Sequence, residues 1–153
     1  MLGLCIARQK EIGCEAKAIQ AHPALMSASL IPPALANEVY RRILSSRQAM
    51  IDTFNKPLPM PTVSWDVKGR VASYARLRKG DIRIRLNAKL FLENVDLYLL
   101  DTIPHEVGHI ATKTWYPRAS SHGHEWVNIL RSCGFPANRC HSYPDIRFQA
   151  SEA

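Results

Sequence analysis

Apolar residues recur at helical spacing in the first well-patterned part of the chain, from Leu35 to about Asn55. The repeating positions are Ala36, Val39, Ile43, Met50 and Phe54. Two prolines at 32–33 suit the entrance of a helix, and a proline-rich stretch at 56–61 enforces extended backbone after it. We therefore predict one long amphipathic helix over residues 35–55.

The pattern then changes to the alternation that is typical of strands. Val63 and Trp65 indicate one short strand, and residues 71–77 indicate a second. After a turn at 79–81, apolar side chains at 82, 84 and 86 alternate with arginines at 83 and 85. This alternation predicts a half-buried antiparallel ribbon with a basic outer face.

Helical spacing returns after residue 87, with a short helix predicted at 90–92. A longer apolar stripe follows, made of Leu99, Leu100, Ile103, Val107, Ile110 and Ala111. Pro104 lies inside this stripe, so we expect the helix to kink or to restart there. A last helix is predicted over residues 125–133, ended by Gly134. An N-terminal helix, a small antiparallel sheet and further helices predict an α+β fold.

The chain has the composition of one globular domain. Its 153 residues are 46% hydrophobic, and we place the domain at 31–147, with an N-terminal extension of uncertain structure at 1–30 and a tail at 148–153. No apolar run is long enough to span a membrane, and no secretory signal is recognisable, so we expect a cytoplasmic protein without a membrane partner. The four cysteines form no C-x-x-C pair and are expected to be reduced thiols.

The strongest chemical signal is the segment His105-Glu106-Val107-Gly108-His109, which lies on the predicted helix. Histidines four residues apart share one face of a helix, one turn apart, where both imidazoles can bind one metal ion. Glu106 can take a proton from a water on that metal, which is the logic of the H-E-x-x-H motif. We therefore expect one catalytic zinc ion, with Gly108 leaving room for close packing behind the motif.

A catalytic zinc needs a third protein ligand and one open position. The segment that opens the next predicted helix offers His122 and His124, and spacing alone does not separate them. Glu125 and His141 are further candidates downstream. From the residues alone, the third ligand remains open.

The net charge of +7 is compatible with a polyanionic partner. Basic residues gather on and beside the predicted ribbon, and the candidates for nucleic-acid contact are Arg76, Arg78, Lys79, Arg83 and Arg85. Such a cluster would contact phosphates without reading sequence. The alternative, which we consider equally well supported, is an ordinary solvated outer face of the sheet. Tyr74 and Trp65 could stack on bases, although core burial is the expected fate of Trp65.

Several segments in a fixed order resemble the SprT-like family, which includes bacterial SprT and the protease domain of Spartan. They are Arg85-Leu86-Asn87, Leu92-Glu93-Asn94, the segment from Pro104 to His109, His122-Gly123-x-Glu125-Trp126 after a thirteen-residue step, and Arg139-x-His141 after Gly134-Phe135-Pro136. The resemblance covers residues 33–143, about three-quarters of the chain. We expect no equivalent of the C-terminal four-cysteine zinc ribbon that bacterial SprT-type proteins often have.

The resemblance implies a zincin-like SprT domain with His105, His109 and His122 as zinc ligands and Glu106 as catalytic base. His124 falls on a position that the family does not use as a ligand. Glu125 and His141 match family positions that we interpret as supporting the site from outside the ligand set, and Glu125 could instead favour the start of its helix. Any nucleic-acid contact would have to come from the basic surface of this domain.

The resulting hypothesis is a zinc metalloendopeptidase that hydrolyses protein substrates. The resemblance suggests substrates associated with or crosslinked to DNA, and a place near the nucleoid. The alternative is a zinc-binding, DNA-binding or regulatory module without efficient proteolysis, and a further alternative is a structural domain without metal. An intact Glu106 favours the enzyme, because a purely structural zinc site needs no base. The sequence does not indicate an oligomeric state.

Overall fold

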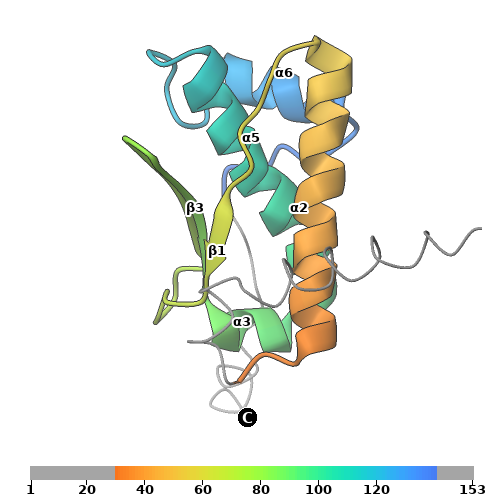
Figure 1. The fold of residues 1–153 in the computed structure, drawn as a ribbon, viewed down its shortest axis with the longest axis vertical. Helices are drawn as coiled ribbons and strands as arrows, with labels where there is room; N and C mark the ends of the chain where they lie inside the picture. The colour runs from red at the N-terminus through yellow and green to blue at the C-terminus, as the bar shows by residue number, and fades with distance from the viewer. Residues whose placement is uncertain (1–29, 141–153) are drawn as a thin grey trace, which may run out of the picture.

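The computed structural model describes residues 30–140 of the chain. It contains one long helix, a three-stranded sheet and a run of helical segments (Figure 1). In order, the elements are α2 (Pro33–Phe54), β1 (Thr62–Ser64), β2 (Ser73–Arg78), β3 (Asp81–Leu86), α3 (Ala88–Glu93), α4 (Val95–Leu97), the π-helical segment η2 (Tyr98–Thr102), α5 (Ile103–Trp115) and α6 (His124–Ser132). The predicted α+β class is confirmed. Residues 1–29 of the extension predicted at 1–30 lie outside the described residues, as do the tail and His141.

The sheet has the order β1-β3-β2, with β2 at one edge. Strands β2 and β3 form the predicted antiparallel hairpin, closed by a tight turn in which Gly80 has a φ of +72°. Strand β1 instead pairs parallel to β3, with Thr62 opposite Arg83. The sheet is therefore mixed, not wholly antiparallel. Side-chain alternation specifies the two faces of a strand but not the direction of its neighbour, which is why the sequence pattern did not reveal this pairing.

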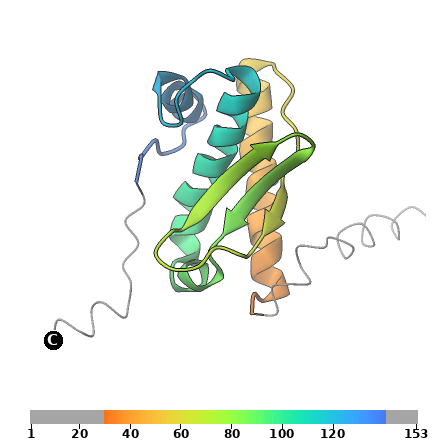
Figure 2. The same ribbon diagram turned by 90° about the vertical axis from the view of Figure 1, so that its left-hand side faces the viewer.

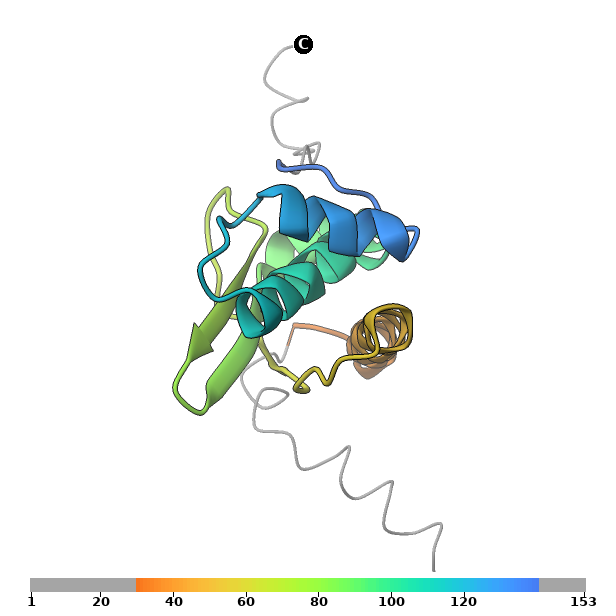
Figure 3. The same cartoon turned by 90° about the horizontal axis from the view of Figure 1, so that it is seen from above.

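Helix α5 lies at the centre of the domain. The sheet covers one side of it, α2 packs on another, and α6 crosses over it (Figures 2 and 3). Nine of the thirteen residues of α5 are buried, including polar His105 and Glu106. Within residues 30–140, no helix combines the length and apolar character that crossing a membrane requires.

Asn87 fixes the loop that leads into β2. Its side chain accepts a hydrogen bond from the Leu90 N–H at the start of α3 and donates to the carbonyls of Gly69 and Val71. Its backbone N–H donates to the Ala72 carbonyl at 2.9 Å. One buried amide therefore ties the end of β3, the start of α3 and the entry of β2 together, upstream of Ser73.

The apolar stripe predicted before α5 is interrupted. Leu100 is 60% exposed, and the predicted inward position is wrong, whereas Tyr98 is fully buried. The cause is the η2 segment, in which the Ile103 N–H bonds the Tyr98 carbonyl five residues back and so rotates the side chains relative to an α-helix. The helix restarts at Ile103 with Pro104 in its first turn, which confirms the restart expected from the sequence.

This restart leaves the carbonyl of Leu99 without a hydrogen bond from the helix backbone, and Arg42 donates one instead. The Ile103 N–H is taken by Tyr98, and Pro104 has no N–H, so neither can bond the carbonyl of Leu99. The Nε of Arg42 on α2 donates to that carbonyl at 2.6 Å. Helix α2 is thereby fastened to the chain immediately before the histidine motif.

We expect Arg42→Met to lower the free energy of unfolding by about 1–3 kcal/mol, because a partly buried carbonyl loses its charged donor. Arg41→Met is the matched control, since Arg41 forms an exposed ion pair with Glu38, and it should change stability by less than about 0.5 kcal/mol. Urea denaturation followed by circular dichroism measures both. Equally small effects would show that the bond to Leu99 does not stabilise the fold.

Candidate metal centre

Three imidazoles meet at the junction of α5 and α6. His105 and His109 lie one turn apart on α5, with their Nε2 atoms 3.0 Å apart. His122, from the loop before α6, places its Nε2 atom 3.2 Å from that of His105. One nitrogen of each histidine lies within 4.8 Å of the others. Nitrogens bound about 2.0–2.1 Å from a tetrahedral zinc lie about 3.3–3.4 Å apart, so this donor set fits a zinc ion.

The structure distinguishes the two histidines that spacing left open. His122 lies in the triad, whereas the side chain of His124 is 92% exposed and its Nε2 lies 3.3 Å from Glu125 Oε1. Glu125 is in the first turn of α6, whose N-cap is Gly123. No side chain caps this end of the helix. Glu125 favours the helix through its negative charge near the positive end of the helix dipole.

Trp126 lies against all three imidazoles. Its ring is edge-on to those of His105 and His122, at 4.8 and 4.9 Å between centroids, and stacked on that of His109 at 5.5 Å. Its indole Nε1 donates to the His105 carbonyl at 3.3 Å. Trp126 lies in the last predicted helix and in one of the family segments, but the sequence predicted no contact between Trp126 and the histidines. Its contact with the imidazoles could have been predicted from its position four residues after His122, on the helix that crosses the histidine motif.

Two glycines permit this crossing. A Cβ on Gly108 would lie 3.0 Å from Leu130 Cδ2 and 3.1 Å from Trp126 Nε1, so a larger residue there would require these side chains on α6 to shift by a few tenths of an ångström. The close packing expected at Gly108 is therefore confirmed. A Cβ on Gly123 would lie 2.5 Å from Ser120 Oγ, inside the loop that presents His122.

Glu106 is held on the sheet side of α5. It is 3% exposed, and the hydroxyl of Ser73, the first residue of β2, donates to its Oε1 atom. The Ala72 carbonyl accepts from the Asn87 N–H and from the Tyr98 hydroxyl at 3.0 Å, which fixes the backbone next to Ser73. Burial raises the pKa of Tyr98 above its ordinary value, and the charge of Glu106 raises it further, so the phenol stays a donor. No pattern in the sequence indicated Ser73, because its contact with Glu106 depends on how the sheet packs on α5.

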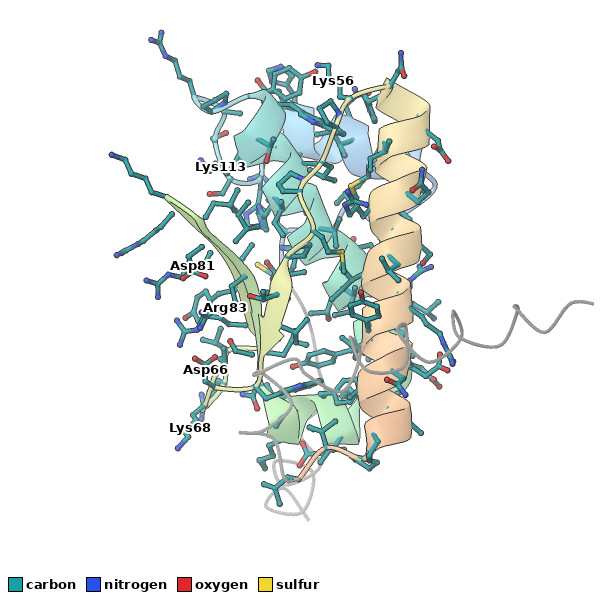
Figure 4. The ribbon with its side chains drawn as sticks, in the orientation of Figure 1. Lys56, Asp66, Lys68, Asp81, Arg83 and Lys113 are labelled. Carbon is teal, nitrogen blue, oxygen red and sulfur yellow. The ribbon has the colours of Figure 1, made fainter. Side chains whose placement is uncertain are left out.

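The predicted basic residues lie on the face of the sheet that points away from the helices, as Arg83 does beside Asp81 and Asp66 (Figure 4). Asp81 forms ion pairs with Arg76 at 3.3 Å and Arg83 at 3.4 Å. Asp66 pairs with Arg85 at 3.1 Å. Within the described residues, Arg78 and Lys79 at the hairpin tip form no ion pair. Two aspartates therefore offset much of the positive charge that the sequence pattern indicated.

The two aromatic residues considered for base stacking differ in exposure. Trp65 is buried against Phe91, with ring centroids 4.9 Å apart, as expected for a core residue. Tyr74 is 49% exposed on the outer face of β2, beneath the guanidinium of Arg85.

Comparison with known proteins identifies the family to which the chain belongs. The model of the SprT-like family matches residues 44–143. The chain is 36% identical to Protein SprT of Vibrio parahaemolyticus over 106 residues, which cover 64% of this chain and 63% of the relative. It is 40% identical to Protein SprT of Pseudomonas paraeruginosa over 94 residues, covering 60% and 56% of the two chains.

A third relative, Protein SprT of Pseudomonas putida, is 32% identical over 118 residues, which cover 76% of this chain and 70% of the relative. The chain thus spans less than two thirds of the first two relatives and somewhat more of the third. No solved structure matches it. Since the family model covers well over half of its residues, including the whole histidine triad, the chain belongs to the SprT-like family.

Proposed function

We propose that this chain is a zinc-dependent metalloendopeptidase acting on protein substrates. The observation that supports this most directly is the buried Glu106 beside a triad of converging imidazoles. A carboxylate is costly to bury even with a hydrogen bond from a neutral hydroxyl such as that of Ser73, and a purely structural zinc site has no use for one in this place. The rival reading, a zinc-binding or regulatory module without proteolysis, leaves Glu106 unexplained.

In this proposal, His105, His109 and His122 hold one zinc ion. Bound there, zinc would supply Lewis-acid chemistry that polarises a peptide carbonyl and makes water more acidic. Glu106 takes the proton of the attacking water and returns it to the leaving amine.

The edge of the sheet supports a proposal for how a substrate binds. Strand β2 is one of the two edge strands in the order β1-β3-β2, it packs against α5, and its first residue contacts Glu106. An extended peptide can add to such an edge by backbone hydrogen bonds. We therefore propose that substrates bind as unfolded or flexible segments alongside β2.

A DNA partner is a second, separate proposal. The observation that favours it is the hairpin tip, where Arg78 and Lys79 have no ion-pair partner within the described residues. Tyr74 adds an exposed aromatic ring on the same face. The contacts would be to phosphates and independent of sequence. The ion pairs of Asp66 and Asp81 predict a small footprint centred on the tip.

Metal removal tests the enzymatic proposal. We expect the purified protein to contain about one zinc per chain, and to cleave casein until a chelator removes the metal. Adding zinc back should restore cleavage. Zinc content measured by mass spectrometry below about a tenth of an equivalent would contradict the metal site itself. Full zinc content without cleavage of any unfolded protein would favour the binding module instead.

A further inference from the structure

The chain reverses direction after α6 and runs back along it (Figure 3). Gly134 has a φ of +76° at the turn, and the Phe135 N–H then donates to the Leu130 carbonyl at 2.9 Å. Phe135 and Ala137 pack against the core. This return brings Arg139 to the end of α6 at which His122 and His124 lie.

An open hollow of about 430 Å³ lies between the returning segment and α6. Val127, Asn128 and Arg131 border it from one face of α6. Arg139 borders it from the returning segment, and His122 at its end belongs to the imidazole triad. The hollow therefore adjoins the proposed zinc site directly.

The lining of this hollow suits an anion. No carboxylate borders it, and neither Arg131 nor Arg139 forms an ion pair within the described part of the chain. The Asn128 Oδ1 atom accepts a hydrogen bond from the Ser132 hydroxyl. The side-chain NH₂ group of Asn128 can therefore donate hydrogen bonds to a ligand. On the sheet, by contrast, Arg83 and Arg85 already pair with aspartates.

We propose that this hollow is a substrate subsite for an acidic side chain, an aspartate or glutamate close to the peptide bond that is cut. The inference rests on the proposed peptidase function, and it names a class of substrate segment for that function. A peptide is favoured over a nucleic acid because His122 borders both the hollow and the proposed zinc site. A side chain near the scissile bond of a bound peptide can therefore enter the hollow. Guanidinium groups bind carboxylates by charge-assisted hydrogen bonds, and the apolar part of Val127 can contact the methylenes of the side chain.

Peptide binding to the full chain tests this without hydrolysis. The probes are short fluorescent peptides that are identical apart from one position, which holds Glu, Gln or Lys and is moved along the sequence. Zinc-loaded Glu106→Gln protein is titrated with each, and fluorescence anisotropy gives Kd. At one position or more, we expect the Glu peptide to bind roughly five- to tenfold more tightly than the Gln peptide, and the Lys peptide to bind more weakly than either.

Combining Arg131→Gln with Arg139→Gln should reduce this preference to about onefold, because both cations are gone. The matched control is Arg41→Gln with Lys89→Gln, which removes two exposed cations from α2 and α3 and should leave the preference intact. A Glu preference that survives loss of Arg131 and Arg139, or that never appears, overturns the inference. Loss of single-stranded DNA binding in place of the peptide preference also overturns it, and assigns the hollow to nucleic acid.

The wild-type protein separates this inference from the proposed function. Equal cleavage of Glu and Gln peptides would contradict only the acidic subsite. Selective binding of Glu peptides without any cleavage would support the subsite and contradict the peptidase.

Discussion

Replacing Glu106 by glutamine is expected to reduce cleavage of protein substrates by about 10²–10⁴-fold, the contribution typical of a general base. Glutamine has the same shape and can still accept the hydrogen bond from Ser73 through its amide oxygen. It cannot take a proton from water at neutral pH. The variant should therefore fold, keep its zinc and lose only the proton-transfer step.

The measurement compares kcat and KM for an unfolded protein substrate, together with zinc content. Glu38→Gln, which removes an exposed carboxylate on α2, is the control and should cleave like the wild type. If Glu106→Gln retained cleavage within about tenfold of wild type, a smaller loss than the 10²-fold minimum expected for a general base, Glu106 would not be the base. If it lost zinc as well, the role of Glu106 would be to stabilise the metal centre.

The parts of the site that the sequence predicted are those set by local geometry. His105 and His109 lie on one face of a helix because of their spacing, and the helix follows from its apolar positions. His122 comes from a different element, so its approach to the other two depends on the crossing of α5 and α6. Spacing left His122 and His124 equivalent, and only the family resemblance or the structure separates them.

Other features escaped the sequence because they depend on long-range packing. Ser73 contacts Glu106 from a strand whose entry loop is held by Asn87, and the two side-chain hydrogen bonds from Asn87 to this loop link residues 18 and 16 positions apart. The parallel pairing of β1 with β3 cannot be predicted from the alternation of apolar and polar residues along the strands. Leu100 is exposed because the chain before Pro104 departs from regular α-helical geometry. The Leu99 carbonyl there accepts its hydrogen bond from Arg42, which lies 57 residues earlier in the sequence.

The contrast between His122 and His124 gives the second large prediction. His122→Ala removes one of three imidazoles from the proposed zinc site, and we expect zinc affinity to fall by at least about 10²-fold, since changes outside the ligand set already cost 10–100-fold. His124→Ala removes an exposed ring paired only with Glu125 among the contacts described above, and should change zinc affinity less than about twofold. Competition with a chromogenic chelator measures both.

His122 also packs edge-on to Trp126, so its loss could disturb the fold as well as the metal. His122→Cys separates the two effects, because a thiolate can replace an imidazole as a zinc ligand but not as an aromatic contact. Zinc affinity above that of His122→Ala in the cysteine variant, with native circular dichroism in both, would establish ligation. The reverse pattern, in which His124→Ala loses zinc and His122→Ala keeps it, would mean that the triad at the junction of α5 and α6 is not the metal site.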